Sequence, residues 1–143
     1  MLKLDVGCGN NKKLGYIGIE VDKSEATDIL ASAECLPFKQ NSVSIIYSRR
    51  VIQHVKNDEK AFQEMFYVLK PQGKVYIIVA SFLGYLYFKL GLSASKHKYH
   101  TFHLYYKSKL VTMLKHAGFS NIKVSKITSR RFSYDLTLKA IKP

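Results

Sequence analysis

The sequence contains few cysteines and prolines, and these shortages exclude several classes of protein. Its 143 residues include only two cysteines, Cys8 and Cys35, with no CxxC spacing, so neither a disulfide framework nor a cysteine-based metal site is predicted. Three prolines, no low-complexity tract and no internal repeat leave an ordinary globular composition, with 47% hydrophobic and 23% charged residues. We therefore expect a single domain over residues 1–143, long enough to bury roughly two thirds of its unfolded surface.

Long apolar segments are also missing. The longest apolar run, residues 81–92, is well short of the ~20 residues that a transmembrane helix needs. The N-terminal residues have no apolar signal-peptide core, because residues 2–6 already have the pattern of a strand. Together with the small number of cysteines, this predicts a reduced, cytoplasmic setting.

Acidic residues are scarce relative to basic ones. Ten Asp and Glu face 23 Lys and Arg, which gives a net charge of +13 and a pI near 9.7. Such a field favours RNA or another polyanion, or an acidic membrane surface. The alternative is that the lysines are simply solvated. RNA-recognition motifs in their usual aromatic and basic form are absent.

Short β-type runs alternate with helical patterns along the chain. Strands are predicted at residues 2–6, 16–21, 28–31, 43–48 and 74–80, and the last is apolar throughout, as a central parallel strand is. A strand–connection–strand order with buried parallel runs predicts an α/β fold with a Rossmann-like, doubly wound, mostly parallel sheet.

Two helices and a hairpin complete the prediction. One helix, between the strands at 43–48 and 74–80, is capped by Asn57 or Asp58 and is ended by residues 70–73. The second begins at Ser108 and closes at Gly118. Two alternating strands, residues 121–127 and 134–141, then flank the sequence TSRR and predict a C-terminal antiparallel hairpin.

The first loop has a ligand-binding composition. The sequence DVGCGN places Asp5 at a strand end and Gly7 and Gly9 in the turn, where glycine allows positive φ and a close approach of ligand to backbone. Lys12 occupies the third glycine position of a G-x-G-x-x-G dinucleotide loop, and the GK[ST] sequence of a phosphate loop is absent. The loop alone is a weak signal.

The order of the patterns that follow is more specific. After the first loop come GIEVD at 18–22, SAECLPF at 32–38, NSVSIIYS at 41–48, RVIQHV at 50–55 and FYVLKPQGKVYIIV at 66–79. This succession resembles the class I S-adenosylmethionine-dependent methyltransferases, especially their methyltransferase type 11 branch. The resemblance covers residues 2–80 and resumes at 100–119, so it includes most of the chain.

The resemblance implies a binding site for S-adenosylmethionine. Asp5, Gly7 and Gly9 would lie under the methionine part of the cofactor. Glu20 would hold both hydroxyls of the ribose, and Val21 would lie against the adenine. Without the resemblance, a valine at this place is as well explained as a core residue of the sheet.

Further positions follow from the same resemblance. Ala33 would offer its backbone N–H to the adenine edge, with Glu34 beside it and Leu36 on the apolar side. Ser48 and Arg49 would supply backbone groups near the amino end of the cofactor. Glu34 alone is equally well explained as a surface charge.

The sequence departs from the family pattern at two places. Many relatives have an aspartate where Ser32 stands, and a serine hydroxyl accepts a hydrogen bond from the adenine amino group more weakly than a carboxylate. Only ten residues separate Gly9 from Glu20, whereas the corresponding distance in a strand–helix–strand unit is usually about 20 residues. We therefore predict a first helix shortened to about one turn, whose N–H groups still point at a carboxylate. Lys12 or Lys13 would add a positive charge there, or would be exposed and idle.

Methyl transfer needs few catalytic groups, because alignment supplies most of the acceleration. His54 is the candidate base for an acceptor that must lose a proton, and the alternative for it is a structural hydrogen bond at a helix start. The Asp/Asn-Pro-Pro-aromatic sequence of exocyclic-amine methyltransferases and a Pro-Cys nucleophile are absent, which argues against those two chemistries.

Two aromatic segments are expected near the acceptor. Residues 82–92 form either a lid or a helix that completes the core, and the core is the default. Residues 96–106 carry His97, His100 and His103 at three-residue spacing. A basic, aromatic rim of the cleft explains this segment better than a metal site, because no cysteine or acid accompanies the histidines.

We therefore expect an S-adenosylmethionine-dependent methyltransferase that acts on an unidentified acceptor, either a small molecule or an anionic macromolecule. The rival is a non-catalytic Rossmann-like module that binds the cofactor or RNA as a partner subunit. The first strand begins at residue 2 with no helix before it, so the cleft should be open or covered by a partner, and a homodimer stays among the expectations.

Overall fold

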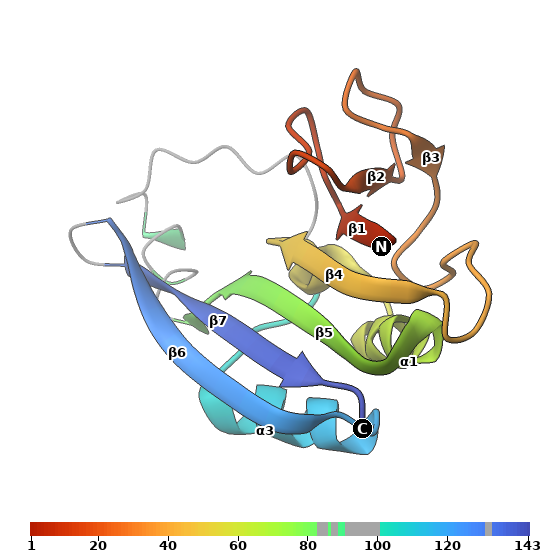
Figure 1. The fold of residues 1–143 in the computed structure, drawn as a ribbon. Coiled ribbons are helices and arrows are strands. Elements are labelled where there is room, and N and C mark those ends of the chain that lie inside the picture. The colour runs from red at the N-terminus through yellow and green to blue at the C-terminus, as the bar shows by residue number, and fades with distance from the viewer. Residues whose placement is uncertain (83–85, 87–88, 91–100, 131–132) are drawn as a thin grey trace.

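The computed structural model describes residues 1–82, 86, 89–90, 101–130 and 133–143. Seven strands form one sheet in the order β3-β2-β1-β4-β5-β7-β6 (Figure 1). The strands are β1 Lys3–Val6, β2 Ile17–Glu20, β3 Ile29–Leu30, β4 Val43–Arg49, β5 Leu69–Ala80, β6 Ser120–Arg130 and β7 Ser133–Ile141. The helices are η1 Ile52–His54, α1 Asp58–Val68 and α3 Lys107–His116.

Strands β1 to β5 are parallel, and β7 joins β5 and β6 with antiparallel pairing. The Rossmann-like, mostly parallel sheet and its C-terminal hairpin are therefore as the sequence predicts. The reversal of strand order beside β1 places the carboxyl ends of β1 and β4 next to each other. This is where open α/β sheets bind their ligands.

The connection between β1 and β2 contains no helix. It consists of two single turns, closed by hydrogen bonds from Asn11 N–H to the Cys8 carbonyl and from Tyr16 N–H to the Lys13 carbonyl. Its middle is fixed to the sheet, because Lys13 N–H donates to Asp5 Oδ2 over 2.7 Å. This hydrogen bond, the one from Gly9 N–H to Glu20 and the Lys12–Asp28 ion pair hold the connection in place without a helix.

The ends of the helices follow local sequence signals. Asn57 is the N-cap of α1, and its side chain accepts a hydrogen bond from Lys60 N–H over 2.9 Å. Helix α3 begins at Lys107, one residue before the predicted Ser108. It ends in a Schellman motif, in which Gly118 N–H donates to Lys115 O and Phe119 N–H to Leu114 O, with Gly118 at φ +99°.

Strand β5 begins earlier than predicted. Residues 70–73 were expected only to stop the helix, but α1 ends at Val68 and Leu69 already pairs with Val43. Lys142 holds this stretch beside the end of β7, because its N–H donates to Gly73 O and its carbonyl accepts from Gln72 N–H.

The core lies on one face of the sheet, and α1 and α3 both pack there (Figure 1). None of the helices described is long and apolar enough to cross a membrane. Both cysteines are free. Of the aromatic segment 82–92, residues 83–85, 87–88 and 91–92 lie outside the described residues, as do His97 and His100, so the predicted lid or core helix stays a prediction.

Tyr105 is the largest fully buried side chain of this core. Its hydroxyl donates to Asp58 Oδ2 over 2.9 Å and lies 3.3 Å from the Ile52 carbonyl. Burial and the neighbouring Asp58 carboxylate raise the pKa of Tyr105 above its ordinary value. The hydroxyl therefore stays protonated in the fold at pH values where an unfolded tyrosine ionises.

We expect Tyr105→Phe to lower the free energy of unfolding by about 1–2 kcal/mol at pH 8, because one buried hydrogen bond is lost. Above pH ~10 only the unfolded wild-type chain releases this proton, so wild-type stability falls and the difference from Tyr105→Phe shrinks by about 1 kcal/mol by pH 11. Urea titrations at pH 8, 10 and 11 measure both quantities. A difference that is constant with pH would contradict this role of the hydroxyl.

Candidate functional site

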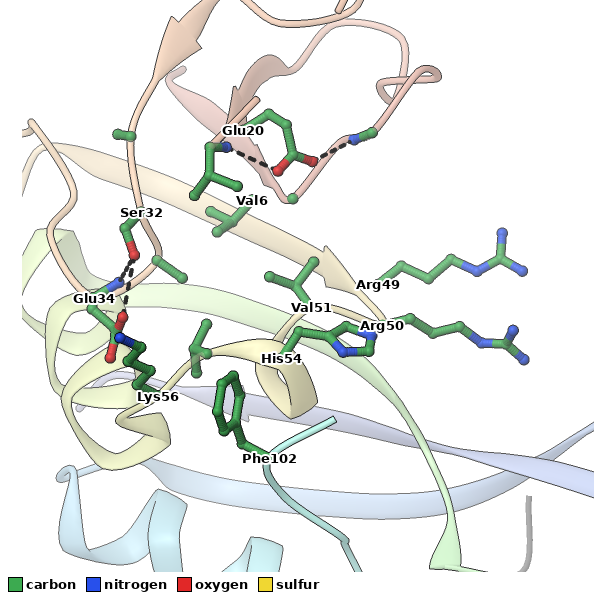
Figure 2. A pocket seen from close by; sticks show the side chains of 16 residues that line it. Val6, Glu20, Ser32, Glu34, Arg49, Arg50, Val51, His54, Lys56 and Phe102 are labelled. Carbon is green, nitrogen blue, oxygen red and sulfur yellow. Dashed lines mark hydrogen bonds between the residues drawn. The ribbon is translucent and has the colours of Figure 1, made fainter. Parts of the chain in front are cut away.

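A cavity of about 510 Å³ opens at the carboxyl ends of the parallel strands, a volume typical of small-molecule sites (Figure 2). Its walls come from the β1 turn, the end of β2, the segment after β3, and the segment from the end of β4 through η1. The lining residues are Val6, Gly7, Gly9, Glu20, Val21, Ala31, Ser32, Ala33, Glu34, Arg49, Arg50, Val51, His54, Val55, Lys56 and Phe102.

Glu20 connects the first turn to the end of β2. Its Oε2 accepts the Gly9 N–H and its Oε1 accepts the Val21 N–H, both over 2.9 Å (Figure 2). A carboxylate has about four lone-pair positions, so two remain for a ligand. The side chain is thus held in place by the backbone and can still accept from a diol.

The two glycines of the turn have different roles. Gly7, at φ +76°, passes so close to Val51 that an added Cβ would lie 1.8 Å from its Cγ2. Gly9, at φ +56°, has no atom within 4 Å of the position of a Cβ. Gly7 therefore allows close packing, and Gly9 leaves open space that a side chain would fill.

Val21 is 56% exposed, which corrects the alternative that it is a core residue. It follows the last residue of β2 and its apolar side chain forms part of the cavity wall. Ala33 is buried and lines the same cavity, whereas Leu36 belongs to the core and does not appear among the lining residues. An exposed valine on a concave wall is suited to cover a flat apolar ring.

Ser32 and Glu34 form a small network at the rim of the cavity. Ser32 Oγ accepts the Glu34 N–H over 3.2 Å and lies 3.5 Å from Glu34 Oε2 (Figure 2). Glu34 Oε1 accepts the Asn57 N–H over 2.6 Å. Glu34 is therefore not a free surface charge, because its carboxylate ties the segment after β3 to the start of α1.

A second cavity of about 340 Å³ adjoins the first and shares Gly7 and Arg49 with it. It is lined by Asp5, Gly7, Cys8, Asn10, Asn11, Lys12, Lys13, Tyr47 and Arg49. Burial raises the pKa of Asp5, against the effect of the hydrogen bond from Lys13 N–H. Lys12 forms an ion pair with Asp28 at 2.6 Å, so it is not an unpaired surface charge.

Three consecutive residues at the end of β4 have different surroundings. Ser48 is fully buried and does not line either cavity, and within the described part of the chain its Oγ has no hydrogen-bond partner. Arg49 is exposed and lines both cavities. Arg50, at φ +57°, forms an ion pair with Asp135 at 2.9 Å, which closes the sheet end against β7.

The cavity is also lined by residues of η1 and of the segments beside it. His54 lines the cavity from η1, and Val51, Lys56 and Phe102 join it (Figure 2). Phe102 is 48% exposed and is placed by its N–H, which donates to the Gln53 carbonyl. The aromatic rim expected for residues 96–106 is therefore present at Phe102.

His103 does not line the cavity. Its Nδ1 lies 3.4 Å from Asp58 Oδ2, and its Nε2 lies 3.1 Å from the Lys56 carbonyl. The described residues contain no cluster of three or more His, Cys, Asp or Glu side chains that could hold a metal ion. His103 fastens the segment after residue 100 to the start of α1.

Comparison with known proteins agrees with this geometry. A family model described as "Methyltransferase domain" matches residues 4–77, and the chain belongs to this methyltransferase family. An uncharacterized protein of Methanocaldococcus jannaschii is 31% identical over 138 residues, covering 87% of this chain and 66% of that protein. An uncharacterized methyltransferase of Mycobacterium tuberculosis is 33% identical, with 57% and 40% covered, and the mouse arginine-hydroxylase NDUFAF5 is 33% identical, with 50% and 26% covered.

The chain thus spans between about a quarter and two thirds of the length of these relatives. Solved structures are similar over nearly the whole chain. A SAM-dependent methyltransferase of Thermotoga maritima has a TM-score of 0.78 at 21% identity, covering 99% of this chain and 82% of that one. Haemonchus contortus phosphoethanolamine N-methyltransferase 2, in complex with S-adenosyl-L-methionine, has a TM-score of 0.75 at 17% identity, covering 100% and 49%.

The contact between Gly7 and Val51 leads to a matched prediction. Gly7→Ala and Gly15→Ala both place a Cβ at positive φ, but nothing lies within 4 Å of the Gly15 position. We expect Gly7→Ala to lower the free energy of unfolding by about 1–3 kcal/mol more than Gly15→Ala, since only the first overpacks the turn. Urea denaturation measures both.

Adding Val51→Ala should shrink the extra cost of Gly7→Ala, because the two Cγ atoms that it meets are removed. Equal destabilisation by Gly7→Ala and Gly15→Ala would show that the turn does not pack against Val51.

Proposed function

We propose that this chain is an S-adenosylmethionine-dependent methyltransferase that acts on an unidentified acceptor. The observation that carries the proposal is the Glu20 carboxylate, fixed by Gly9 and Val21 at the rim of a cavity with an exposed valine on its wall. This arrangement places a carboxylate that can accept hydrogen bonds from hydroxyl groups beside an apolar surface. A ribose joined to a flat base requires both.

The residues present fit this cofactor. Glu20 would hold the ribose diol, with Val21 and the Ala33 N–H on the adenine. The open space over Gly9 would receive the sugar side of the methionine chain, and the smaller cavity beside Asp5 its amino acid end. When bound, the cofactor supplies an activated methyl group on a positively charged sulfur.

The backbone of Ser48 and Arg49 is proposed to contact the amino end of the cofactor, as the family resemblance implies. The Ser48 side chain takes no part, because it is buried outside both cavities. Ser32 lines the cavity and would face the adenine amino group, with Glu34 beside it.

The acceptor side is basic and aromatic. Arg49, Lys56, His54 and Phe102 line it, so the acceptor is proposed to be an anionic or flat molecule. His54 would take the proton that the acceptor loses. The other residues exclude water and orient the acceptor, which supplies most of the acceleration in methyl transfer.

A binding module without methyl transfer is the competing function. The connection of β1 to β2 has turns where a helix would stand. Two similar proteins, an arginine-hydroxylase and the [4+2]-cyclase SpnF, are named for reactions other than methyl transfer. The two functions differ in one readout, because only the methyltransferase passes label from the cofactor to another molecule.

We expect calorimetry to show micromolar binding of S-adenosylmethionine and of its demethylated product. Glu20→Ala should weaken this binding by at least 10-fold, because two hydrogen bonds to the ribose and the hold on Gly9 are lost. Asp22→Ala is the matched control, since it removes a carboxylate two residues away that lines neither cavity. Absence of binding at millimolar cofactor would refute the proposed function.

His54→Ala should reduce methyl incorporation from isotope-labelled cofactor into a cell extract by about 100-fold or more, with cofactor affinity unchanged. His103→Ala is the control histidine, because its ring contacts Asp58 and the Lys56 carbonyl. Mass spectrometry of the labelled products identifies the acceptor. Equal loss in the two variants would assign His54 a structural role, and no labelled product with intact cofactor binding would favour the binding module.

A further inference from the structure

Side chains of the central strands alternate between two faces of the sheet. Leu4 and Ile46 point into the core under α1 and α3. The alternate positions of the opposite face carry tyrosines, Tyr47 on β4 and Tyr76 on β5, and Tyr16 stands just before β2. All three are half-buried, and no helix of the described residues packs over them.

The tyrosines lie in register with each other and with lysines. Tyr47 stands directly opposite Tyr76 on the neighbouring strand, about 4.8 Å away along the hydrogen-bonding direction. Tyr76 stands opposite Lys139, which in turn stands opposite Lys123 on β6. Two aromatic side chains and two basic ones therefore follow each other across four adjacent strands.

A second row runs beside the first. Lys3 on β1 stands opposite Ile45, and Ile45 stands opposite Lys74 on β5. Lys74, Lys123 and Lys139 are exposed. The acids of this face, Asp5 and Asp135, are buried; Asp5 holds the Lys13 N–H and Asp135 pairs with Arg50. The face is therefore positively charged toward solvent.

The ring faces are reached by ammonium groups. Lys13 Nζ lies 4.6 Å from the ring centroid of Tyr47, Lys3 Nζ 5.6 Å from that of Tyr16, and Lys139 Nζ 5.7 Å from that of Tyr76. In each pair a cation lies within about 6 Å of the ring centroid, the distance of a cation–π contact. Burial raises the pKa of Tyr16, and the neighbouring Tyr76, Asp5 and Tyr47 raise it further.

We infer that this tyrosine–lysine face binds single-stranded nucleic acid. It consists of Tyr16, Tyr47, Tyr76, Lys3, Lys74 and Lys139. Unpaired bases stack on aromatic rings whatever their sequence, and lysines neutralise the phosphates between them. The lysines now over the rings swing to the phosphates when a base takes their place. A duplex cannot bind in this way because its bases are already stacked.

The charge of the chain favours this occupant over a second copy. Two such faces would bring together lysines of one sign on chains that each carry +13, whereas a polyanion is attracted to both the face and the overall field. Tyr47 and Lys13 also line the smaller cavity, so the face reaches the edge of the site but does not include Glu20 or Val21. Of the six residues of the face, the inference shares only Tyr47 with the cavities of the proposed function, so the two can fail separately.

The test is fluorescence anisotropy of a labelled 15-nucleotide RNA of mixed sequence with the whole chain, from 50 to 300 mM salt. We expect a Kd on the order of 10 µM or tighter at 50 mM salt, and at least 10-fold weaker binding of a duplex of the same sequence. The same RNA should quench the tyrosine emission, which can be observed directly because the chain has no tryptophan.

Two matched sets of variants locate the site. Tyr47→Leu with Tyr76→Leu should weaken RNA binding by about 10- to 100-fold, since two stacking surfaces are lost and apolar bulk is kept. Its control is Tyr67→Leu with Tyr106→Leu, two exposed tyrosines carried by α1 and the start of α3. Circular dichroism and melting curves check that each double variant is folded.

The second set compares equal losses of charge. Lys3→Gln, Lys74→Gln and Lys139→Gln together should reduce the slope of log K against log salt by about 2, because each lysine releases about 0.7 counterion from a single strand. Lys60→Gln, Lys107→Gln and Lys115→Gln remove the same charge from α1 and α3 and should change the slope much less.

Three results would overturn the inference. Equal weakening by both lysine sets would show general attraction without a site, and equal binding of single strand and duplex would exclude base stacking. A chain that does not bind RNA but sediments as a dimer, dissociated by the Tyr47 and Tyr76 changes, would assign the face to a second copy. Cofactor binding, measured in parallel with wild type and Glu20→Ala, reports on the proposed function independently.

Discussion

The arrangement of the site depends on one carboxylate. Glu20 receives the N–H groups of Gly9 and Val21, and so fixes the first turn relative to the end of β2. In larger units of this kind a helix between the two strands performs that task. Here the turns between them are anchored by Glu20 at one end and by Asp5 at Lys13 N–H in the middle. The residue that would bind the sugar is thus also the residue that shapes the binding site.

The predictable parts of this structure are those set by local chemistry. Asn57 caps α1 because its side chain and the N–H that it accepts are three residues apart, and Glu20 reaches the site because it ends a strand. Phe102 could not be assigned in this way, since it is placed by the Gln53 carbonyl, far away in the sequence. The Arg50–Asp135 pair joins residues 85 positions apart for the same reason.

Val21 shows why strand periodicity alone misleads at a strand end, whereas Ser48 follows it. Val21 has the residue type of a core position, but β2 ends one residue earlier and leaves it at the cavity wall. Ser48 is still inside β4, so alternation turns its hydroxyl toward the buried side. A shift of one residue in the strand boundary decides whether a side chain meets ligand, solvent or core. Boundaries are the part of a sheet that sequence patterns define least well.

The order of the last three strands has a consequence for synthesis of the chain on the ribosome. β7 is made last, but it lies between β5 and β6 and pairs with both. Until β7 has left the exit tunnel, β5 has an unpaired edge and β6 has no strand partner. The sheet therefore closes only after β7 has been made, and a chain arrested before β7 would expose the unpaired edge of β5, which is suited to chaperones or to aggregation.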